Sequence, residues 1–240
     1  MRNVALRRRT MGSLIAIVGF LAAAGPAGAT VMAYTSETDY LDALSALTLG
    51  SFEESFEDEA VWGATRSPGT ASSVLSLGIT WTANNGNSAL STNMATARSG
   101  WALFSSPHGD YASGTGCTVA GACGDGLIGT GSMTLFAVGG WISGTAGANV
   151  DFILDGDDLN PITFDAAPPF SGSSSHLFFG VIDDTGFAQF EIREVEGTLG
   201  DEQFIWADDF SVAVPEPSSL TTLSLAILGI AFARRSRVRL

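Results

Sequence analysis

Hydrophobic and polar positions follow two different periods along the chain. Leu41, Leu44 and Leu47 recur at every third position behind Ser36. This spacing places the three leucines on one face of a helix, and a serine at the start of a helix accepts hydrogen bonds from the free N–H groups of the first turn. The pattern predicts one short amphipathic helix over residues 36–47 that packs against a larger structure.

After this helix, the chain consists of short segments rich in β-branched and aromatic residues, separated by Gly, Ser, Asn and Asp. In one of them, Phe187 and Gln189 fall on one face and Phe190 and Ile192 on the other, which is the alternation of a half-buried antiparallel strand. The segments that we expect to form strands are residues 74–82, 101–105, 132–143, 149–154, 161–165, 176–182, 187–195 and 204–212.

These elements predict an all-β fold, a single jelly-roll-like β-sandwich with one short N-terminal helix. The sequence contains no repeat of fixed period, and no linker divides the body of the chain. We therefore expect three parts: a signal peptide over residues 1–29, the β-sandwich ectodomain over residues 30–213, and a C-terminal sorting segment with a hydrophobic helix over residues 214–240.

The N-terminal segment has the three regions of a secretory signal peptide. Arginines precede an apolar run from Leu14 to Ala24, and the small residues Ala27, Gly28 and Ala29 follow. This pattern is typical of a signal-peptidase site, so we expect cleavage after Ala29 and export of the rest of the chain. Retention as a membrane anchor is the alternative. The arginines leave twin-arginine export open beside the Sec route.

Charge is divided unevenly along the chain, whose formal net charge is −14. Most arginines lie at the two ends, and residues 30–213 contain three arginines, no lysine and 24 acidic residues, a net charge of −21. Nucleic-acid binding begins with Lys and Arg neutralising phosphates, so this composition argues against a nucleic-acid partner. Anionic lipid headgroups are repelled for the same reason.

Cys117 and Cys123 are the two cysteines of the chain and lie six positions apart in a Gly-rich stretch. In an exported protein, two neighbouring cysteines of this kind favour a local disulfide. A metal site is the weaker alternative, because His108 is the one histidine near them in sequence and a thiol-based metal site needs more ligands.

Asp155, Asp157 and Asp158 lie in a predicted turn between two strands. Calcium takes about six to eight oxygen ligands, and carboxylates in a loop with glycine suit it, so these residues are a candidate calcium site. The stretch lacks the glycine and glutamate of an EF-hand loop. The alternative is that Asp and Gly form a hairpin turn. The acidic residues between Glu53 and Glu59 are expected to be solvated.

The sequence carries no clear catalytic motif. Neither His108 nor His176 belongs to an H-E-x-x-H zinc pattern, and no G-x-S-x-G elbow occurs. No carboxylate pair stands out for glycoside hydrolysis, so we expect that the protein is not an enzyme. Most of the five tryptophans are expected in the core, whereas one on a solvent face would suit stacking on sugar rings. They are Trp62, Trp81, Trp101, Trp141 and Trp206.

The C-terminal segment combines a proline pair, an apolar run and a basic tip. Pro215 and Pro217 flank Glu216 and prevent a strand or helix from continuing through them. The apolar run over residues 220–233 would be roughly 21 Å long as a helix, shorter than a bilayer core. Arginines follow it and would stay on the cytoplasmic side, so the segment has the character of a short stop-transfer helix.

The order of these features closely resembles the PEP-CTERM sorting signal of Gram-negative bacteria that make exopolysaccharide. The matching residues are Val214, Pro215, Glu216, Pro217, Arg234 and Arg235. The same signature is also labelled an ice-binding-protein C-terminal domain, a label that does not imply ice binding by the body. The resemblance implies that an exosortase-like membrane protease recognises Pro-Glu-Pro and cuts near it, after transient anchoring in the inner membrane. A plain C-terminal tail anchor is the alternative.

The body of the chain is similar, in HLFFGVIDDTGFAQFEI and FIWADDFSVAV, to the last strands of β-sandwich ectodomains that often precede this signal. Ala207 stands where those domains have Ile or Leu. The resemblance implies delivery to the cell surface or extracellular matrix, and a structural, adhesive or exopolysaccharide-associated role. The alternative is a secreted carbohydrate-binding protein or carbohydrate-active enzyme that uses the same sorting route.

Overall fold

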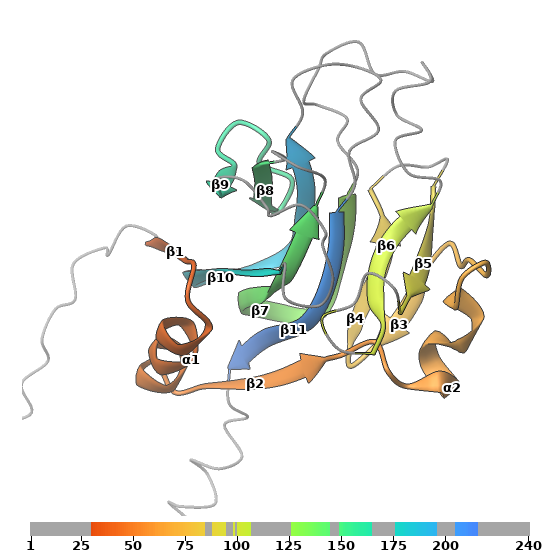
Figure 1. The fold of residues 1–240 in the computed structure, drawn as a ribbon. Helices are drawn as coiled ribbons and strands as arrows, with labels where there is room; N and C mark the ends of the chain where they lie inside the picture. The colour runs from red at the N-terminus through yellow and green to blue at the C-terminus, as the bar shows by residue number, and fades with distance from the viewer. Residues whose placement is uncertain are drawn as a thin grey trace, which may run out of the picture.

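The computed structural model describes residues 30–84, 88–94, 98, 100–106, 126–144, 149–164, 176–195 and 205–215. These residues form antiparallel strands with two short α-helices (Figure 1). The strands are β1 (Val31–Tyr34), β2 (Leu49–Glu54), β3 (Val74–Ser76), β4 (Ile79–Ala83), β5 (Ala89–Asn93), β6 (Ala102–Ser106), β7 (Gly126–Gly144), β8 (Asn149–Leu154), β9 (Ile162–Phe164), β10 (Leu177–Val195) and β11 (Ile205–Pro215). The helices are α1 (Glu37–Ala46), α2 (Glu59–Trp62) and the 3-10 turn η1 (Gly63–Thr65).

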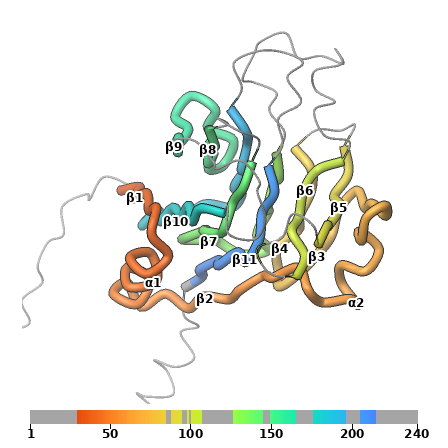
Figure 2. The backbone as a smooth tube through the Cα atoms, viewed as in Figure 1, coloured from red at the N-terminus to blue at the C-terminus, as the bar shows by residue number. Residues whose placement is uncertain are grey.

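Two long strands, β7 and β10, run through the whole fold and join two parts of the sheet (Figure 2). In the part that we call the first half-sheet, residues 137–144 of β7 pair with β11 and with the beginning of β10, and β1, β2, β6 and β5 extend it. In the second half-sheet, residues 126–135 of β7 pair with the end of β10 and with β4, and β3, β8 and β9 extend it. The all-β sandwich prediction is confirmed.

The bend in β10 lies where its pairing register with β7 shifts, between Ile182 and Gln189. Asp183 Oδ1 accepts hydrogen bonds from the backbone N–H and the hydroxyl of Thr185, at 2.8 and 2.7 Å. Gly186 has φ +79°, which glycine adopts easily because it lacks Cβ. The two strands predicted over residues 176–182 and 187–195 are therefore one strand with an internal bend.

The register shift also changes which side chains enter the core. Phe187 is buried together with Phe190 and Ile192, whereas Gln189 is half-buried on the opposite face. The extra residue of a β-bulge moves the following side chains to the other face. The prediction that Phe187 shares a face with Gln189 is therefore wrong, while the alternation from Gln189 onward is confirmed.

An aromatic cluster fills the core between the half-sheets. The Phe56 ring lies edge-on to Trp62 and Trp81, with centroids 5.0 and 5.5 Å apart, and all three side chains are fully buried. Edge-to-face pairs of this kind stabilise a core beyond the area that they bury. The core position predicted for most tryptophans is confirmed for Trp62 and Trp81.

A buried carboxylate in β2 organises this aromatic cluster. Glu54 Oε1 accepts hydrogen bonds from the backbone N–H of Phe56 at 2.7 Å and from the indole Nε1 of Trp62 at 3.1 Å. Phe56 has φ +60°, a left-handed conformation that is unusual for a bulky residue. The prediction that the acidic residues from Glu53 to Glu59 are solvated is therefore wrong at Glu54, although Glu53 is exposed.

Helix α1 covers the outer face of the first half-sheet. The Ser36 hydroxyl accepts from the Asp39 backbone N–H, as predicted for the helix start. Tyr40 and Leu44 are the buried positions, while Leu41 and Leu47 are 43% and 42% exposed. The helix therefore packs through positions four apart, and the predicted leucine face is wrong.

Two glycines make room for this contact. An added Cβ would lie 2.9 Å from the Tyr40 ring at Gly180 and 3.2 Å from it at Gly139. Gly139 and Gly180 are cross-strand partners in β7 and β10, so they form a shallow trough in which the Tyr40 ring lies. The Tyr40 hydroxyl donates to the Ser211 carbonyl at 3.1 Å and fixes α1 to β11.

Candidate functional site

The predicted sorting residues begin on the last described strand. Val214 and Pro215 pair with Gly50 and Leu49 of β2, so β11 continues three residues past the predicted end at 212. Proline is tolerated at the end of a strand because no further ladder hydrogen bond is needed from it. The other predicted sorting residues lie outside the described residues. They are Glu216, Pro217, Arg234 and Arg235.

Several other predictions also concern residues that the structure does not describe. They are the cleavage-site residues Ala27 and Ala29, the disulfide between Cys117 and Cys123, and the hydrophobic helix over residues 220–233. These stay predictions. Within the described ranges, no helix has the length and apolar character needed to span a bilayer.

The three aspartates of the candidate calcium site each have a protein partner. Asp155 Oδ1 accepts from the backbone N–H groups of Ala188 and Gln189, at 2.7 and 3.0 Å. Asp157 accepts from two groups of its own turn, and Asp158 forms an ion pair with Arg193 at 2.9 Å. Across the part of the chain that the structure describes, no three His, Cys, Asp or Glu side chains form a group suited to a metal. These contacts are those of the turn alternative, and calcium binding stays a prediction.

Asp158 belongs to a charged cluster on the outer face of the second half-sheet. Arg193 lies between Asp158 and Glu191, and Asn84 Nδ2 donates to Glu191 Oε1 at 2.9 Å. Burial raises the pKa of the Glu191 carboxyl, and the hydrogen bond from Asn84 and the charge of Arg193 oppose that rise. These ion pairs and the hydrogen bond from Asn84 are the contacts of a structural network, although Arg193 Nε is buried with no hydrogen-bond partner among the described residues.

The outer face of the first half-sheet also carries two partly exposed tryptophans, one of them beside the start of α1. Ile142 and Ala207 are paired and face the core, so their neighbours Trp141 and Trp206 face outward on adjacent strands. Ser143 is the cross-strand partner of Trp206. The two indoles are thus diagonal neighbours on one face, within reach of a single ligand. The sequence could not select which tryptophans would be partly exposed.

Polar groups surround Trp141. The Arg98 guanidinium stacks on its ring at 4.0 Å from the centroid and pairs with Asp209 at 3.0 Å. The Trp141 Nε1 donates to Glu37 Oε1 at 3.2 Å, and Asp208 Oδ2 accepts from the Arg98 backbone N–H at 2.8 Å. Cation–π and hydrogen-bond contacts therefore hold the indole in a fixed orientation. We call Trp141, Trp206 and these polar side chains the tryptophan face.

Ser143 and His176 lie within hydrogen-bond distance of each other. Ser143 Oγ lies 3.2 Å from His176 Nε2, and both side chains are buried. A nucleophilic serine needs an accessible hydroxyl and a base held by a third group. The buried position of Ser143 argues against that use, and this pair is not a candidate nucleophile.

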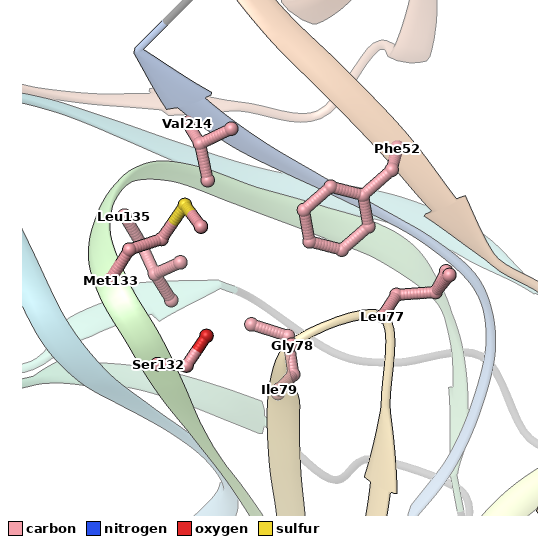
Figure 3. A pocket seen from close by; sticks show the side chains of 8 residues that line it. All are labelled: Phe52, Leu77, Gly78, Ile79, Ser132, Met133, Leu135 and Val214. Atoms are coloured by element: carbon pink, nitrogen blue, oxygen red, sulfur yellow. The ribbon is translucent and has the colours of Figure 1, made fainter. Parts of the chain in front are cut away.

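An apolar groove lies beside the end of β11 (Figure 3). Its volume is about 200 Å³, and Figure 3 shows Val214, Phe52 and Met133 facing one another across it. The groove residues are Phe52, Leu77, Gly78, Ile79, Ser132, Met133, Leu135 and Val214. Leu77 and Met133 are 54% and 57% exposed at its rim. The sequence missed this groove because its residues come from four separate strands or turns.

Comparison with known proteins identifies the C-terminal segment. Residues 213–237 match the family model described as the PEP-CTERM protein-sorting motif. No curated protein matches the chain. The K1 cleaved adhesin domain of Lys-gingipain from Porphyromonas gingivalis W83 is similar at 14% identity, with a TM-score of 0.38, over 68% of this chain and 97% of that chain. TmCBM61 in complex with β-1,4-galactotriose is similar at 13% identity, with a TM-score of 0.32, over 66% of this chain and 97% of that chain.

Proposed function

Since the chain carries a PEP-CTERM protein-sorting motif, which implies exosortase-dependent export to the cell surface, we propose that residues 30–213 form a structural or adhesive module of that surface or of its matrix. The module is not an enzyme in this proposal. The observation that carries it is the position of the motif, whose match begins at Ala213 within β11. The sorting segment therefore begins on the last strand, and processing after Pro217 would leave every described strand intact.

The experiment follows the C-terminus of the exported chain. The full chain is expressed in a Gram-negative host with and without an exosortase, and mass spectrometry identifies its C-terminal peptide. With the exosortase, we expect no peptide beyond about Ser218, and without it the RRSRVRL terminus. Glu216→Ala should block processing, whereas Glu53→Ala, an exposed acid on β2, should not. Processing that is equal with and without the exosortase would overturn the proposal.

The absence of catalysis is tested separately. Incubation of the processed protein with a panel of extracellular polysaccharides should release no oligosaccharide. Reproducible release with a measurable turnover rate would replace the structural role by that of a carbohydrate-active enzyme.

A second candidate, carbohydrate binding, is favoured by the tryptophan face. Trp141 and Trp206 lie on one side of the first half-sheet, and Arg98, which stacks on the Trp141 ring, is paired with the Asp209 carboxylate. Sugar rings stack on indoles through their C–H groups, and their hydroxyls bond to carboxylate and guanidinium groups. If this face binds polysaccharide, Trp206→Ala should weaken retention on a polysaccharide column. Trp101→Ala, which removes a tryptophan that packs against the main core under Arg66, should leave retention unchanged in the folded protein.

A further inference from the structure

The apolar groove and the exit of the chain from the domain share one place. Val214 lines the groove, and Pro215 is the last described residue. The exposed side chains of Leu77 and Met133 form its rim, and the residues that line it include no charged side chain. Large apolar side chains grouped around an open groove mark a surface that contacts an apolar partner.

The chain length after Pro215 limits how far this end can be from a membrane. Four residues separate Pro215 from Leu220, where the apolar run over 220–233 begins. Five Cα steps span at most about 18 Å, even in a fully extended chain. The headgroup layer on each side of a bilayer is about 5–8 Å thick. If Leu220 lies at the edge of the hydrocarbon core, Pro215 lies at most about 10–13 Å beyond the headgroup layer, so the tether is short enough for the groove to rest on the headgroups.

From this geometry, we propose that the groove end of the ectodomain rests on the lipid surface until the exosortase cuts the chain, with Leu77 and Met133 in the headgroup layer. The proposal rests on the proposed function, because it needs the uncut segment 220–233 in the bilayer. The contact would fix the distance between Pro-Glu-Pro and the membrane, where the exosortase acts. Two side chains bury too little apolar area to hold a protein on a membrane alone, so the cut would release the domain.

The charge of the domain specifies the lipid. The net charge of −21 over residues 30–213 repels anionic headgroups. The contact is therefore expected on zwitterionic phosphatidylcholine, and it should weaken as anionic phosphatidylglycerol is added. This dependence is opposite to that of a protein that docks through basic residues.

The test places the full chain in phosphatidylcholine nanodiscs and observes methionine methyl groups by NMR. Leu159→Met supplies the control methyl, because Leu159 is 91% exposed in the turn between β8 and β9, away from the groove. Lipid that carries a spin label at the headgroup broadens methyl signals near the bilayer surface. We expect the Met133 signal to lose most of its intensity, and the signal from position 159 to keep it. Insertion of about twelve Gly and Ser residues after Pro217 should restore much of the Met133 signal, because a longer tether lowers the effective concentration of the lipid surface.

The outcomes separate this inference from the proposed function. A chain that does not co-elute with the nanodisc contradicts membrane anchoring itself, and the inference fails with it. If the chain co-elutes with the nanodisc but the Met133 signal keeps its full intensity, only the proposed lipid contact is overturned. A Met133 signal that shifts without broadening would assign the groove to the chain's own segment after Pro217, and would also overturn it.

Discussion

Replacement of Glu54 by alanine is expected to destabilise the core more than any other change to the acidic residues of β2. Glu54 is buried, and its Oε1 atom accepts hydrogen bonds from the Phe56 backbone and the Trp62 indole. In Glu54→Ala both donors stay buried without this acceptor. The left-handed backbone at Phe56 also loses the hydrogen bond that holds it.

The magnitude follows from the two donors. A buried donor left without an acceptor costs about 1–3 kcal/mol, so two cost about 2–6 kcal/mol. Glu54 Oε2 is buried with no hydrogen-bond partner among the described residues, and its removal offsets part of that cost. We therefore expect a loss of about 3 kcal/mol in the free energy of unfolding. For a chain of this size, that loss lowers Tm by roughly 6–12 °C.

Urea unfolding, monitored by tryptophan fluorescence, measures the effect. Glu54→Gln keeps an oxygen acceptor, so its free energy of unfolding should fall by about 1 kcal/mol or less. Glu53→Ala is the matched control, because Glu53 is the exposed neighbour on the same strand, and it should stay within about 0.5 kcal/mol of the parent. The role assigned to Glu54 is refuted if the free energy of unfolding of Glu54→Ala stays within about 0.5 kcal/mol of the parent. It is also refuted if Glu54→Ala and Glu53→Ala lower that free energy equally.

Three further predictions concern the sheet surfaces. Because burial raises the pKa of Glu191 above 4.5, its contribution to stability is fully present below pH 4.5 and is lost as pH rises through the folded-state pKa; Glu191→Gln should flatten that part of a stability–pH curve. Asp155→Ala should lower the free energy of unfolding in urea by about 1–3 kcal/mol, because the backbone N–H groups of Ala188 and Gln189 lose their acceptor. If the turn alternative holds, Tm of the parent should not differ between millimolar calcium and chelator, whereas a Tm increase with calcium would support the predicted calcium site. Gly180→Ala should lose about 1–3 kcal/mol in the same assay, because its methyl would meet the Tyr40 ring, and unchanged stability would contradict the trough.

The sequence predicted the helix start but not its buried face. Ser36 and the acids behind it determine where α1 begins through local hydrogen bonds, which local sequence encodes. The buried face depends instead on what the helix meets. Gly139 and Gly180, about 100 and 140 residues away, provide the trough for Tyr40, and therefore Leu41 and Leu47 are left exposed.

Strands were predicted correctly where apolar and polar residues alternate regularly. Where the backbone departs from a regular strand, strands were missed or their ends were placed wrongly. Residues 149–154 match β8, whereas residues 74–82 were predicted as one strand and form the hairpin of β3 and β4. Leu77 and Gly78, at φ +49° and +80°, form the tight turn between them. Such turns usually carry Asn-Gly or Asp-Gly, and leucine at the first position hides the signal. The break predicted between residues 182 and 187 is instead a bend inside β10, because Asp and Gly favour bends within a strand as well as turns between strands.

The sorting motif could be predicted from sequence because all its parts are contiguous. The tryptophan face and the apolar groove could not, since each joins residues from strands that are distant in the chain. The charged residues were equally ambiguous. Glu54 lies in the core, Asp158 pairs with Arg193, and Asp155 accepts from β10, although all three are acids in sequence clusters that looked alike.

In the proposed function, the β-sandwich is exported and separated from the segment that follows its last strand. Mass spectrometry of the protein recovered from the cell surface and medium of an exosortase-containing host tests it most directly. We expect an N-terminus at Thr30 and a C-terminus near Ser218, with no peptide from the RRSRVRL tip. Exported protein that retains the intact tip would contradict it.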